Sequence, residues 1–287
     1  MSTGAGRPRA RPASDVVVTA SLDNLTSADV RFLQEAARLG PLHVRIPSDA
    51  LIERTTGRLP TFPEAERRFL AASLRCVNTV GVVDRDLHAA LARLAPRFPT
   101  LVVREGEDDG RIRSGWTGRD RTLRTVRAAD LDGYPAWTAD VGETQPPLPG
   151  APARTVVTGC YDMLHSGHVR FFMDASAVGE LYVVVGSDHN VELLKGPGHP
   201  LQHAEERLYM VGAVRQVHRC LVSSGSGWMD AEPEIARIRP RYYVVNEDGD
   251  QPEKREFCAS RGIEYVVLRR VPQPGLPARS GTALRGF

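Results

Sequence analysis

The hydrophobic pattern of the C-terminal half alternates short apolar runs with amphipathic segments. The run LYVVVGSD (181–188) is rich in β-branched residues and has the length of a buried strand. Before it, Val169 and Phe172 share one face of a predicted helix at 166–178, and Gly179 is placed to end that helix. This alternation predicts an α/β fold with a parallel, doubly wound sheet and ligands at the carboxyl ends of its strands.

The same rule predicts the other elements of this half. In the segment 203–217, for example, Leu208, Val211 and Val214 recur at helical spacing. The predicted elements are, in order, strand 155–159, helix 166–178, strand 181–188, helix 203–217, strand 219–222, helix 231–238, strand 241–246, helix 252–261 and strand 264–268.

The N-terminal half repeats this pattern. When Thr26 is aligned with His165, 139 residues later, TASLDNLTSADVRFL (19–33) falls on TGCYDMLHSGHVRFF (158–172). So many matches in one order indicate a tandem duplication. The matched pairs include Asp23 with Asp162, Gly40 with Gly179, Ser48-Asp49 with Ser187-Asp188 and, after a slip of one residue, Arg75 with Arg215.

Changes of composition divide the chain into four segments. Residues 1–14 are rich in Arg and Pro and lack an apolar signal core, so we expect a disordered tail. The first copy occupies 15–106 and the second 153–287. Between them, 107–152 holds Gly, Pro and charged residues, which is typical of a linker.

Composition narrows the class of partner. The 287 residues are 41% hydrophobic and 25% charged, with a net charge of +2 and acids interspersed among the arginines. The sequence has no basic stripe of the kind that binds nucleic acid. No apolar run approaches the roughly 18 residues of a membrane span. The four cysteines lie far apart, with no CxxC pair and no dense disulfide framework. This spacing favours reduced thiols. We therefore predict a cytoplasmic protein with a small-molecule partner.

Two histidines mark the candidate chemistry. His165 and His168 lie where the first strand of the second copy becomes a helix, with Ser166 and Gly167 between them. A helix N-terminus offers unpaired N–H groups to a phosphate, and two imidazoles from one turn can donate to oxygens on the same phosphorus. The structural alternative is a pair of surface histidines at a helix start.

The stretch GCYDMLHSGH (159–168) resembles the HxGH signature of the cytidylyltransferase-like nucleotidyltransferases. That family includes glycerol-3-phosphate, choline-phosphate and ethanolamine-phosphate cytidylyltransferases, and adenylyltransferases such as the heptose 1-phosphate enzyme. The resemblance implies two Rossmann-like nucleotidyltransferase domains in tandem, the first of them degenerate. Its further motifs are LLKGPGHP (193–200), EERLYMVGAVRQV (205–217), VVNEDGD (244–250) and ARSGTALR (278–285).

The resemblance also implies roles for individual residues. His165, His168 and Lys195 would be catalytic, with Lys195 and Asp162 facing the acceptor. The recurrence of Asp162 as Asp23 and of Arg215 as Arg75 leaves a structural role open for both. The residues implied for nucleotide binding are Gly159, Cys160, Tyr161, Asp162, Gly167, Arg215, Asn246, Asp250, Arg279, Ser280 and Thr282.

The first copy lacks this chemistry. Thr26, Asp29 and Thr56 stand where the second copy has its two histidines and Lys195, and an aspartate at a phosphate-facing position would repel a triphosphate. By resemblance to the tandem ethanolamine-phosphate cytidylyltransferases, we expect a catalytically inactive copy packed on the active one as an intramolecular pseudo-dimer. A regulatory ligand site is the alternative, and association of two chains as a homodimer stays open.

The predicted function is transfer of CMP from CTP to a small phosphate- or phosphonate-bearing acceptor, with release of pyrophosphate. Mg²⁺ is expected with the nucleoside triphosphate, and no metal ligands are assigned. One alternative is an adenylyltransferase that uses ATP on a sugar phosphate, and another is a non-catalytic nucleotide-sensing module. A class I aminoacyl-tRNA synthetase is disfavoured because a lysine-rich KMSKS-like loop and a tRNA-binding extension are missing.

Overall fold

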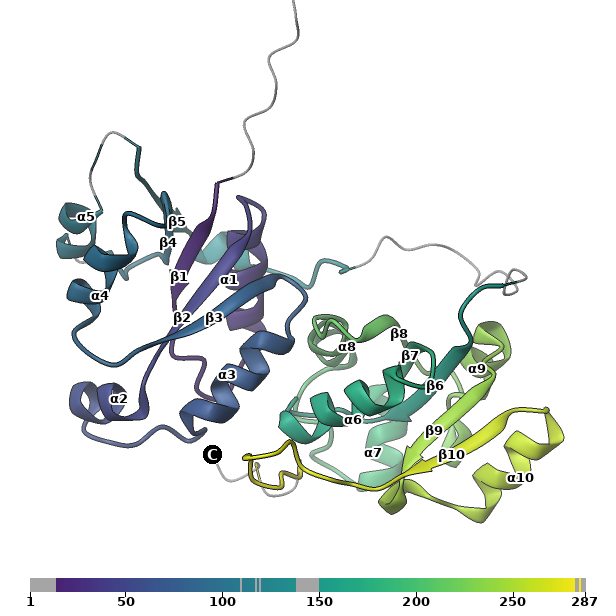
Figure 1. The fold of residues 1–287 in the computed structure, drawn as a ribbon. Helices are drawn as coiled ribbons and strands as arrows, with labels where there is room; N and C mark the ends of the chain where they lie inside the picture. Colours follow the sequence, from purple (N-terminus) through teal and green to yellow (C-terminus); the bar gives the residue numbers. More distant parts are fainter. Residues whose placement is uncertain are drawn as a thin grey trace, which may run out of the picture.

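Parallel strand pairing organises both halves of the chain in the computed structural model, which describes residues 14–108, 110–116, 118, 120–137, 150–281 and 284. Each half forms a five-stranded sheet, and the two sheets lie side by side in Figure 1. All strand pairs are parallel. The predicted α/β class with two doubly wound sheets is therefore confirmed.

The first sheet has the order β3-β2-β1-β4-β5. Its strands are β1 (Val16–Thr19), β2 (Leu42–Pro47), β3 (Val77–Val83), β4 (Thr100–Arg104) and β5 (Thr122–Val126). The helices between them are α1 (Ser27–Ala37), α2 (Asp49–Thr56), α3 (Glu64–Ser73), α4 (Leu87–Leu94), α5 (Arg111–Gly115) and the 3₁₀ turn η1 (Ala128–Leu131).

The second sheet, β8-β7-β6-β9-β10, repeats that order element for element. Its strands are β6 (Arg154–Gly159), β7 (Glu180–Val185), β8 (Val217–Val222), β9 (Tyr242–Asn246) and β10 (Glu264–Leu268). The helices are α6 (Ser166–Ser176), α7 (Asp188–Lys195), α8 (Ala204–Gly212), α9 (Glu232–Ile238) and α10 (Pro252–Ser260), with 3₁₀ turns η2 (Gly227–Met229) and η3 (Glu247–Gly249).

Helix α7 is the element of the second half that the hydrophobic pattern did not predict. It has eight residues, and of its apolar side chains Val191 is buried whereas Leu193 and Leu194 are 59% and 58% exposed, so its apolar face is too short to be recognised with certainty from the pattern. A local signal was present: Ser187 caps the helix by accepting the Asn190 N–H, as Ser48 caps α2 by accepting the Leu51 N–H. The repeated Ser-Asp pair therefore marks two equivalent helix starts.

The first sheet extends beyond residue 106, into the stretch expected to be a linker. Strand β5 pairs with β4 from Thr122 to Val126, and Trp116 after α5 is buried against the outer face of the sheet. Strand β5 lies at the sheet edge and is half exposed, so it lacks the continuous apolar run of a central strand. Its sequence therefore does not stand out from the Gly- and Pro-rich stretch around it, in which Trp116 and Trp137 are the residues expected to give partial order.

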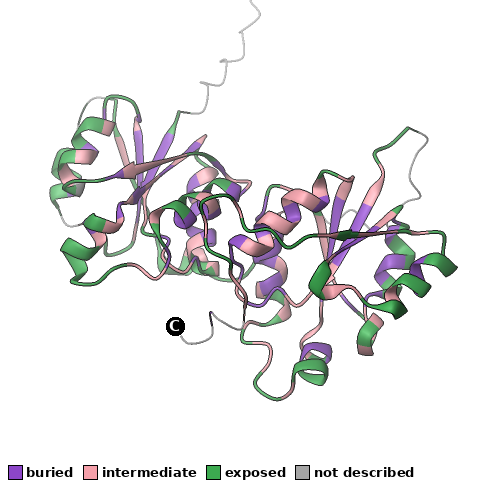
Figure 2. Ribbon diagram, turned by 60° about the horizontal axis from the view of Figure 1, so that its bottom comes forward, coloured by how far each residue is buried: buried purple, intermediate pink, exposed green. Residues whose placement is uncertain are grey.

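The two halves share one hydrophobic core. A single cluster of buried side chains includes residues of both sheets, and α3 packs on α6 as α1 packs on α8. Figure 2 shows the buried segments at the centre of each sheet and along the helices where the halves meet. The core therefore does not stop at the boundary between the repeats.

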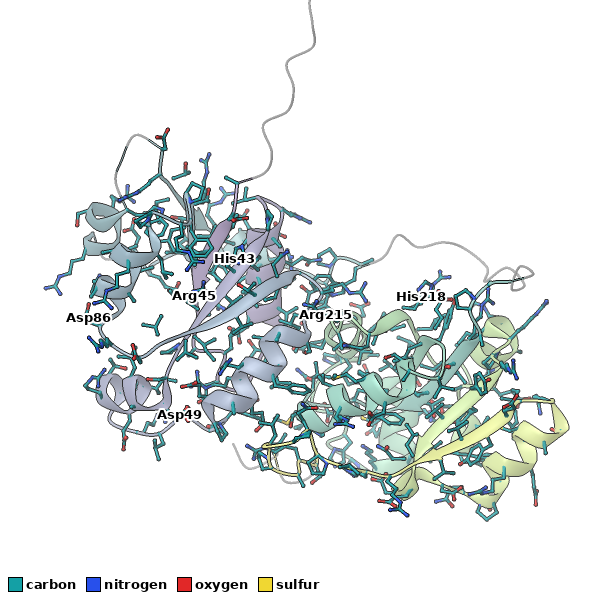
Figure 3. The ribbon with its side chains drawn as sticks, in the orientation of Figure 1. His43, Arg45, Asp49, Asp86, Arg215 and His218 are labelled. Atoms are coloured by element: carbon teal, nitrogen blue, oxygen red, sulfur yellow. The ribbon has the colours of Figure 1, made fainter. Side chains whose placement is uncertain are left out.

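Two arginines make reciprocal contacts across this boundary. The Nη2 atom of Arg75 donates to two carbonyl oxygens of the second half, and Nη2 of Arg215 donates to two of the first. Arg215 is labelled where the halves meet in Figure 3. The contacts have the pseudo-twofold relation of an isologous dimer interface. The acceptors are Val214 and Val217 for Arg75, and Leu74 and Val77 for Arg215.

We predict that Arg75→Ala and Arg215→Ala cost the same stability, because each removes two charge-assisted bonds to carbonyl groups at the boundary. Each should lower the free energy of unfolding by about 2 kcal/mol. Urea denaturation of the two variants and the wild type measures both values. A large loss for one variant and none for the other would contradict the reciprocal interface.

Candidate active site

The site begins where strand β6 passes into helix α6. His165 is the N-cap of α6, and its Nδ1 accepts the Gly167 N–H at 3.1 Å. Because Nδ1 accepts this bond, the ring proton resides on Nε2 in the neutral tautomer. The Nε2 atom is buried and has no hydrogen-bond partner in the described parts of the chain. The cap therefore leaves one buried N–H donor without a partner beside the helix N-terminus, although His165 itself is not among the residues that line the cavity described below.

His168 lies against His165 one turn into the helix. The two rings stack with centroids 3.8 Å apart, and the ring of Tyr161 meets His168 edge-on at 5.3 Å. Nδ1 of His168 is likewise buried without a hydrogen-bond partner in the described parts of the chain. A Cβ atom on Gly167 would lie 3.0 Å from the His165 ring, so glycine is the residue that lets this ring fold over the helix start.

Both imidazoles are neutral at neutral pH. Burial, reinforced by the positive charges of Arg270 and Arg279, lowers the pKa of His165 to about 4. The pKa of His168 is lowered well below its usual value, first by burial and then by His165. The histidines therefore act as hydrogen-bond donors without adding charge of their own.

A cavity of about 260 Å³ lies beside His168 at the carboxyl ends of β6 and β9. This is the switch point of the second sheet, where ligands of doubly wound folds bind. The structure brings together here many of the residues implied by the resemblance. They are Gly159, Cys160, Tyr161, Asp162, Gly167, His168, Lys195 and Asn246.

Three cations line the cavity: Lys195, Lys254 and Arg270. Burial lowers the pKa of Lys254. Sequence analysis missed Lys254 and Arg270 because neither falls in a recognised motif. The available signal was the position of Arg270, two residues beyond strand β10, at the same sheet edge as the histidines. The lining also includes the carboxylates of Asp162 and Asp248, and Asp248 pairs with Arg270, so the cavity carries a small net positive charge that favours an anion.

Asp162 lines the cavity, yet its carboxylate holds a loop. Its two oxygens accept the N–H groups of Leu201 and Gln202 at 2.9 and 3.0 Å. Asp23 accepts two backbone N–H groups in the same way in the first half. The geometry supports the structural alternative for Asp162 rather than the expected contact with the acceptor.

Neither Arg215 nor Asp250 is among the residues that line the cavity, although Asp250 directly follows Gly249, which does. The guanidinium of Arg215 is committed to main-chain carbonyls at the boundary between the halves. The carboxylate of Asp250 forms an ion pair with Arg255, at 2.5 Å from Oδ2 to Nη2. Each charged group already has a partner of its own, so the arrangement gives neither a contact with the triphosphate.

Residues 278–281, the described first part of the motif ARSGTALR (278–285), which we call the late motif, pass over the N-terminus of α6. Gly281 lines the cavity and Ser280 precedes it, whereas Thr282 lies outside the described residues. The carbonyl oxygen of Arg279 lies 3.4 Å from the Cβ position of Gly167. The side chain of Arg279 turns away from the expected phosphate contact and pairs with Glu66 of the first half at 2.8 Å.

The equivalent helix start in the first half is filled by a carboxylate. Oδ2 of Asp29 accepts the N–H and the hydroxyl of Thr26, and the Thr26 hydroxyl oxygen accepts the Asp29 N–H. Arg104 donates to the other carboxylate oxygen. The N-terminus of α1 thus carries its own anion, in the place where α6 presents histidines.

The described residues supply no cluster of three or more His, Cys, Asp or Glu side chains able to hold a metal ion. A bilayer-spanning segment is also not found among the helices that the structure describes, all of which are too short or too polar.

The switch point of a parallel sheet, two neutral histidines at a helix start and a cationic cavity together form a site of the kind found in nucleotidyltransferases. A family model described as cytidylyltransferase-like matches residues 156–285, and the chain belongs to this family, as the HxGH resemblance predicted.

Curated relatives match less than half of this chain. An FAD synthase of Aciduliprofundum boonei is 35% identical over 119 residues, which are 40% of this chain and 76% of the relative. An FAD synthase of Methanocella arvoryzae is 30% identical over 135 residues, 46% of this chain and 92% of the relative. The bifunctional protein HldE of Methylococcus capsulatus is 39% identical over 104 residues, 36% of this chain and 21% of that protein.

The pKa of His165 predicts a pH dependence of stability. In the unfolded chain a histidine binds its proton near pH 6.5, whereas folded His165 binds it only near pH 4. Between these values the unfolded state holds more protons, so the free energy of unfolding falls as the pH drops. His165→Asn keeps a capping oxygen for the Gly167 N–H and removes the titrating ring.

We expect the wild type to lose about 2 kcal/mol more than His165→Asn between pH 7 and pH 5. Urea denaturation of both proteins at the two pH values measures the difference, in which the titration of other groups cancels. Equal losses would contradict a depressed pKa for His165.

Proposed function

We propose that this nucleotidyltransferase transfers AMP from ATP to a small phosphate-bearing acceptor and releases pyrophosphate. The chemistry rests on one observation above all, the buried and unpartnered Nε2–H of His165 at the start of α6. The choice of ATP is supported by the relatives, since FAD, the product of an FAD synthase, contains an adenylyl group. Transfer of CMP from CTP, the function expected from the sequence, is the competing proposal.

In the proposed reaction an oxygen of the acceptor phosphate attacks the α-phosphorus of the nucleotide in line. The new P–O bond forms as the bond from the α-phosphorus to the bridging oxygen breaks, and that oxygen leaves with pyrophosphate. His165 and His168 donate hydrogen bonds to phosphate oxygens as charge moves onto them. Because the protein forms no covalent bond to the substrate, its contribution is positioning and charge stabilisation.

The cations of the cavity divide between the two substrates in this proposal. Lys195, at the C-terminal end of α7, orients the anion of the acceptor, and Arg270 neutralises the triphosphate near the late motif. A phosphonate presents the same oxygens to Lys195 as a phosphate does. Mg²⁺ enters as the counter-ion of the nucleotide, and no step requires a resident metal.

The first half takes no part in turnover in this proposal, although it belongs to the same folded unit. Asp29 occupies the anion position of α1, and Arg104 neutralises it there. A triphosphate would have to displace this internal ion pair and meet a like charge. We assign residues 15–126 a structural role, in which they replace the second subunit of a dimer.

We predict that pyrophosphate release is faster with ATP than with CTP when an acceptor is present. A coupled pyrophosphate assay with the four nucleoside triphosphates, against flavin mononucleotide, sugar phosphates, phospho-alcohols and phosphonates, measures the preference. Faster release with CTP would restore the cytidylyltransferase proposal. Binding of nucleotide without release in any combination would favour the nucleotide-sensing alternative.

We predict that His165→Asn lowers kcat at least about a hundredfold, the scale for losing one donor that stabilises developing charge. The change keeps the helix cap, so the melting temperature should stay close to that of the wild type. His165→Ala, which also removes the cap, should lose about 1 kcal/mol of stability besides. His168→Ala should lower kcat by at least a similar factor. Near-normal kcat in His165→Asn would refute the donor role.

A further inference from the structure

One buried carboxylate of the first half reaches the active site of the second. Glu66 lies on α3, is completely buried, and accepts a hydrogen bond from Ser166 Oγ at 2.6 Å. Its Oε2 also accepts from Nε and Nη2 of Arg279, at 3.0 and 2.8 Å. Ser166 is the first residue of α6, and Arg279 belongs to the late motif, so a residue outside the catalytic half contacts both parts of the phosphate site.

Arg279 is also connected to the cavity, through its main-chain carbonyl group. The carbonyl oxygen of Arg279 accepts a hydrogen bond from Nη2 of Arg270 at 2.8 Å, and Arg270 lines the cavity. The same carbonyl lies against Gly167 at the start of α6. When Glu66 holds the Arg279 side chain, it therefore fixes both the segment that crosses the helix start and one cation of the anion site.

A second contact from the first half also restrains the side chain of Arg279. The guanidinium of Arg279 lies over the ring of Phe62, with the carbon of the guanidinium 5.0 Å from the ring centroid. Arg279 is thus held between a carboxylate and an aromatic face, both supplied by the first half. This arrangement leaves the side chain few alternative positions.

The contact is asymmetric, although the boundary around it is symmetric. Glu206 is the pseudo-symmetric counterpart of Glu66, and its Oε1 accepts from Ser27 Oγ at 2.6 Å, as Glu66 accepts from Ser166. The side-chain amide of Gln202 donates to the same Oε1 of Glu206, whereas Oε2 of Glu66 binds Arg279. The serine contact therefore belongs to the interface in general, and the arginine contact occurs at the half that carries the histidines.

We propose that Glu66 is a positioning residue for nucleotidyl transfer, supplied to the site by the N-terminal half of the same chain, which lacks the histidines. Through Arg279 it holds Arg270 and the late motif over the start of α6, so that the triphosphate meets an assembled site. This inference rests on the proposed nucleotidyl transfer. It gives the degenerate half a part in nucleotide binding, although that half binds no nucleotide itself.

Steady-state kinetics of Glu66→Gln in the full chain tests this role. Glutamine keeps the size of the side chain and an acceptor for Ser166, but it loses the charge that orients Arg279. We expect the KM for the nucleoside triphosphate to rise about tenfold while kcat stays within threefold, because His165 and His168 are unchanged. Glu66→Asp, which keeps the charge on a shorter side chain, should give an intermediate KM.

A matched control and a double-mutant cycle separate positioning from general damage to the interface. Glu206→Gln alters the symmetric contact with Ser27 and should leave the KM within twofold of the wild type. Arg279→Gln should raise the KM as much as Glu66→Gln does, and the double variant should be no worse than either single variant. A structural role alone would give additive effects and a similar loss in Glu206→Gln.

A wild-type KM in Glu66→Gln, in an enzyme that releases pyrophosphate normally, would overturn this inference and leave the proposed function intact. Absence of release in the wild type would instead refute the proposed function. If Glu66→Gln fails to fold, Arg279→Gln alone decides, since its side chain is partly exposed. An unchanged KM in Arg279→Gln would then overturn the inference.

Discussion

A completely buried arginine fixes the geometry of each half. The guanidinium of Arg207 donates to the carbonyl oxygens of Gln202, Cys160 and Gly186, and to the carboxylate of Asp188. A buried charge is stable only when its donors are satisfied, so these bonds tie the loop after β6, the end of β7 and the starts of α7 and α8 to one point. The equivalent Arg67 does the same in the first half. The cavity of the catalytic half opens beside this anchored edge.

The halves share this scaffold and differ at one helix start. In the second half the start of α6 presents imidazole nitrogens without protein partners, whereas Asp29 satisfies the start of α1 internally. The same scaffold therefore accommodates either histidines or a carboxylate at this helix start. A helix N-terminus needs a negative partner or a hydrogen-bond acceptor, and an aspartate within the chain supplies one permanently.

Much of the fold, and the position of the histidine pair, could be predicted from the sequence because the signals were local or repeated. Alternating apolar runs predicted the strands, and the short spacing of His165 and His168 placed both rings on one turn. What could not be predicted depends on contacts between segments far apart in the chain. Arg215 belongs to a family motif, yet its guanidinium binds main-chain carbonyls of the other half. The hint of this structural role in the sequence was its recurrence as Arg75, which makes the reciprocal contact. The repeat pairs Glu66-Arg67 with Glu206-Arg207, but this recurrence does not reveal the contact of Glu66 with Arg279, 213 residues away.

The electrostatics explain why neutral histidines suit this pocket. Lys195, Lys254 and Arg270 already supply fixed positive charge, and a protonated imidazole beside them would be repelled as well as desolvated. Neutral rings avoid that penalty and still donate hydrogen bonds whose direction the helix cap determines. Arg279 itself lies near His165, and its positive charge adds to burial and to Arg270 in lowering the pKa of that imidazole. Burial and the neighbouring positive charges thus act together to keep both histidines in the neutral state in which they can serve as oriented donors.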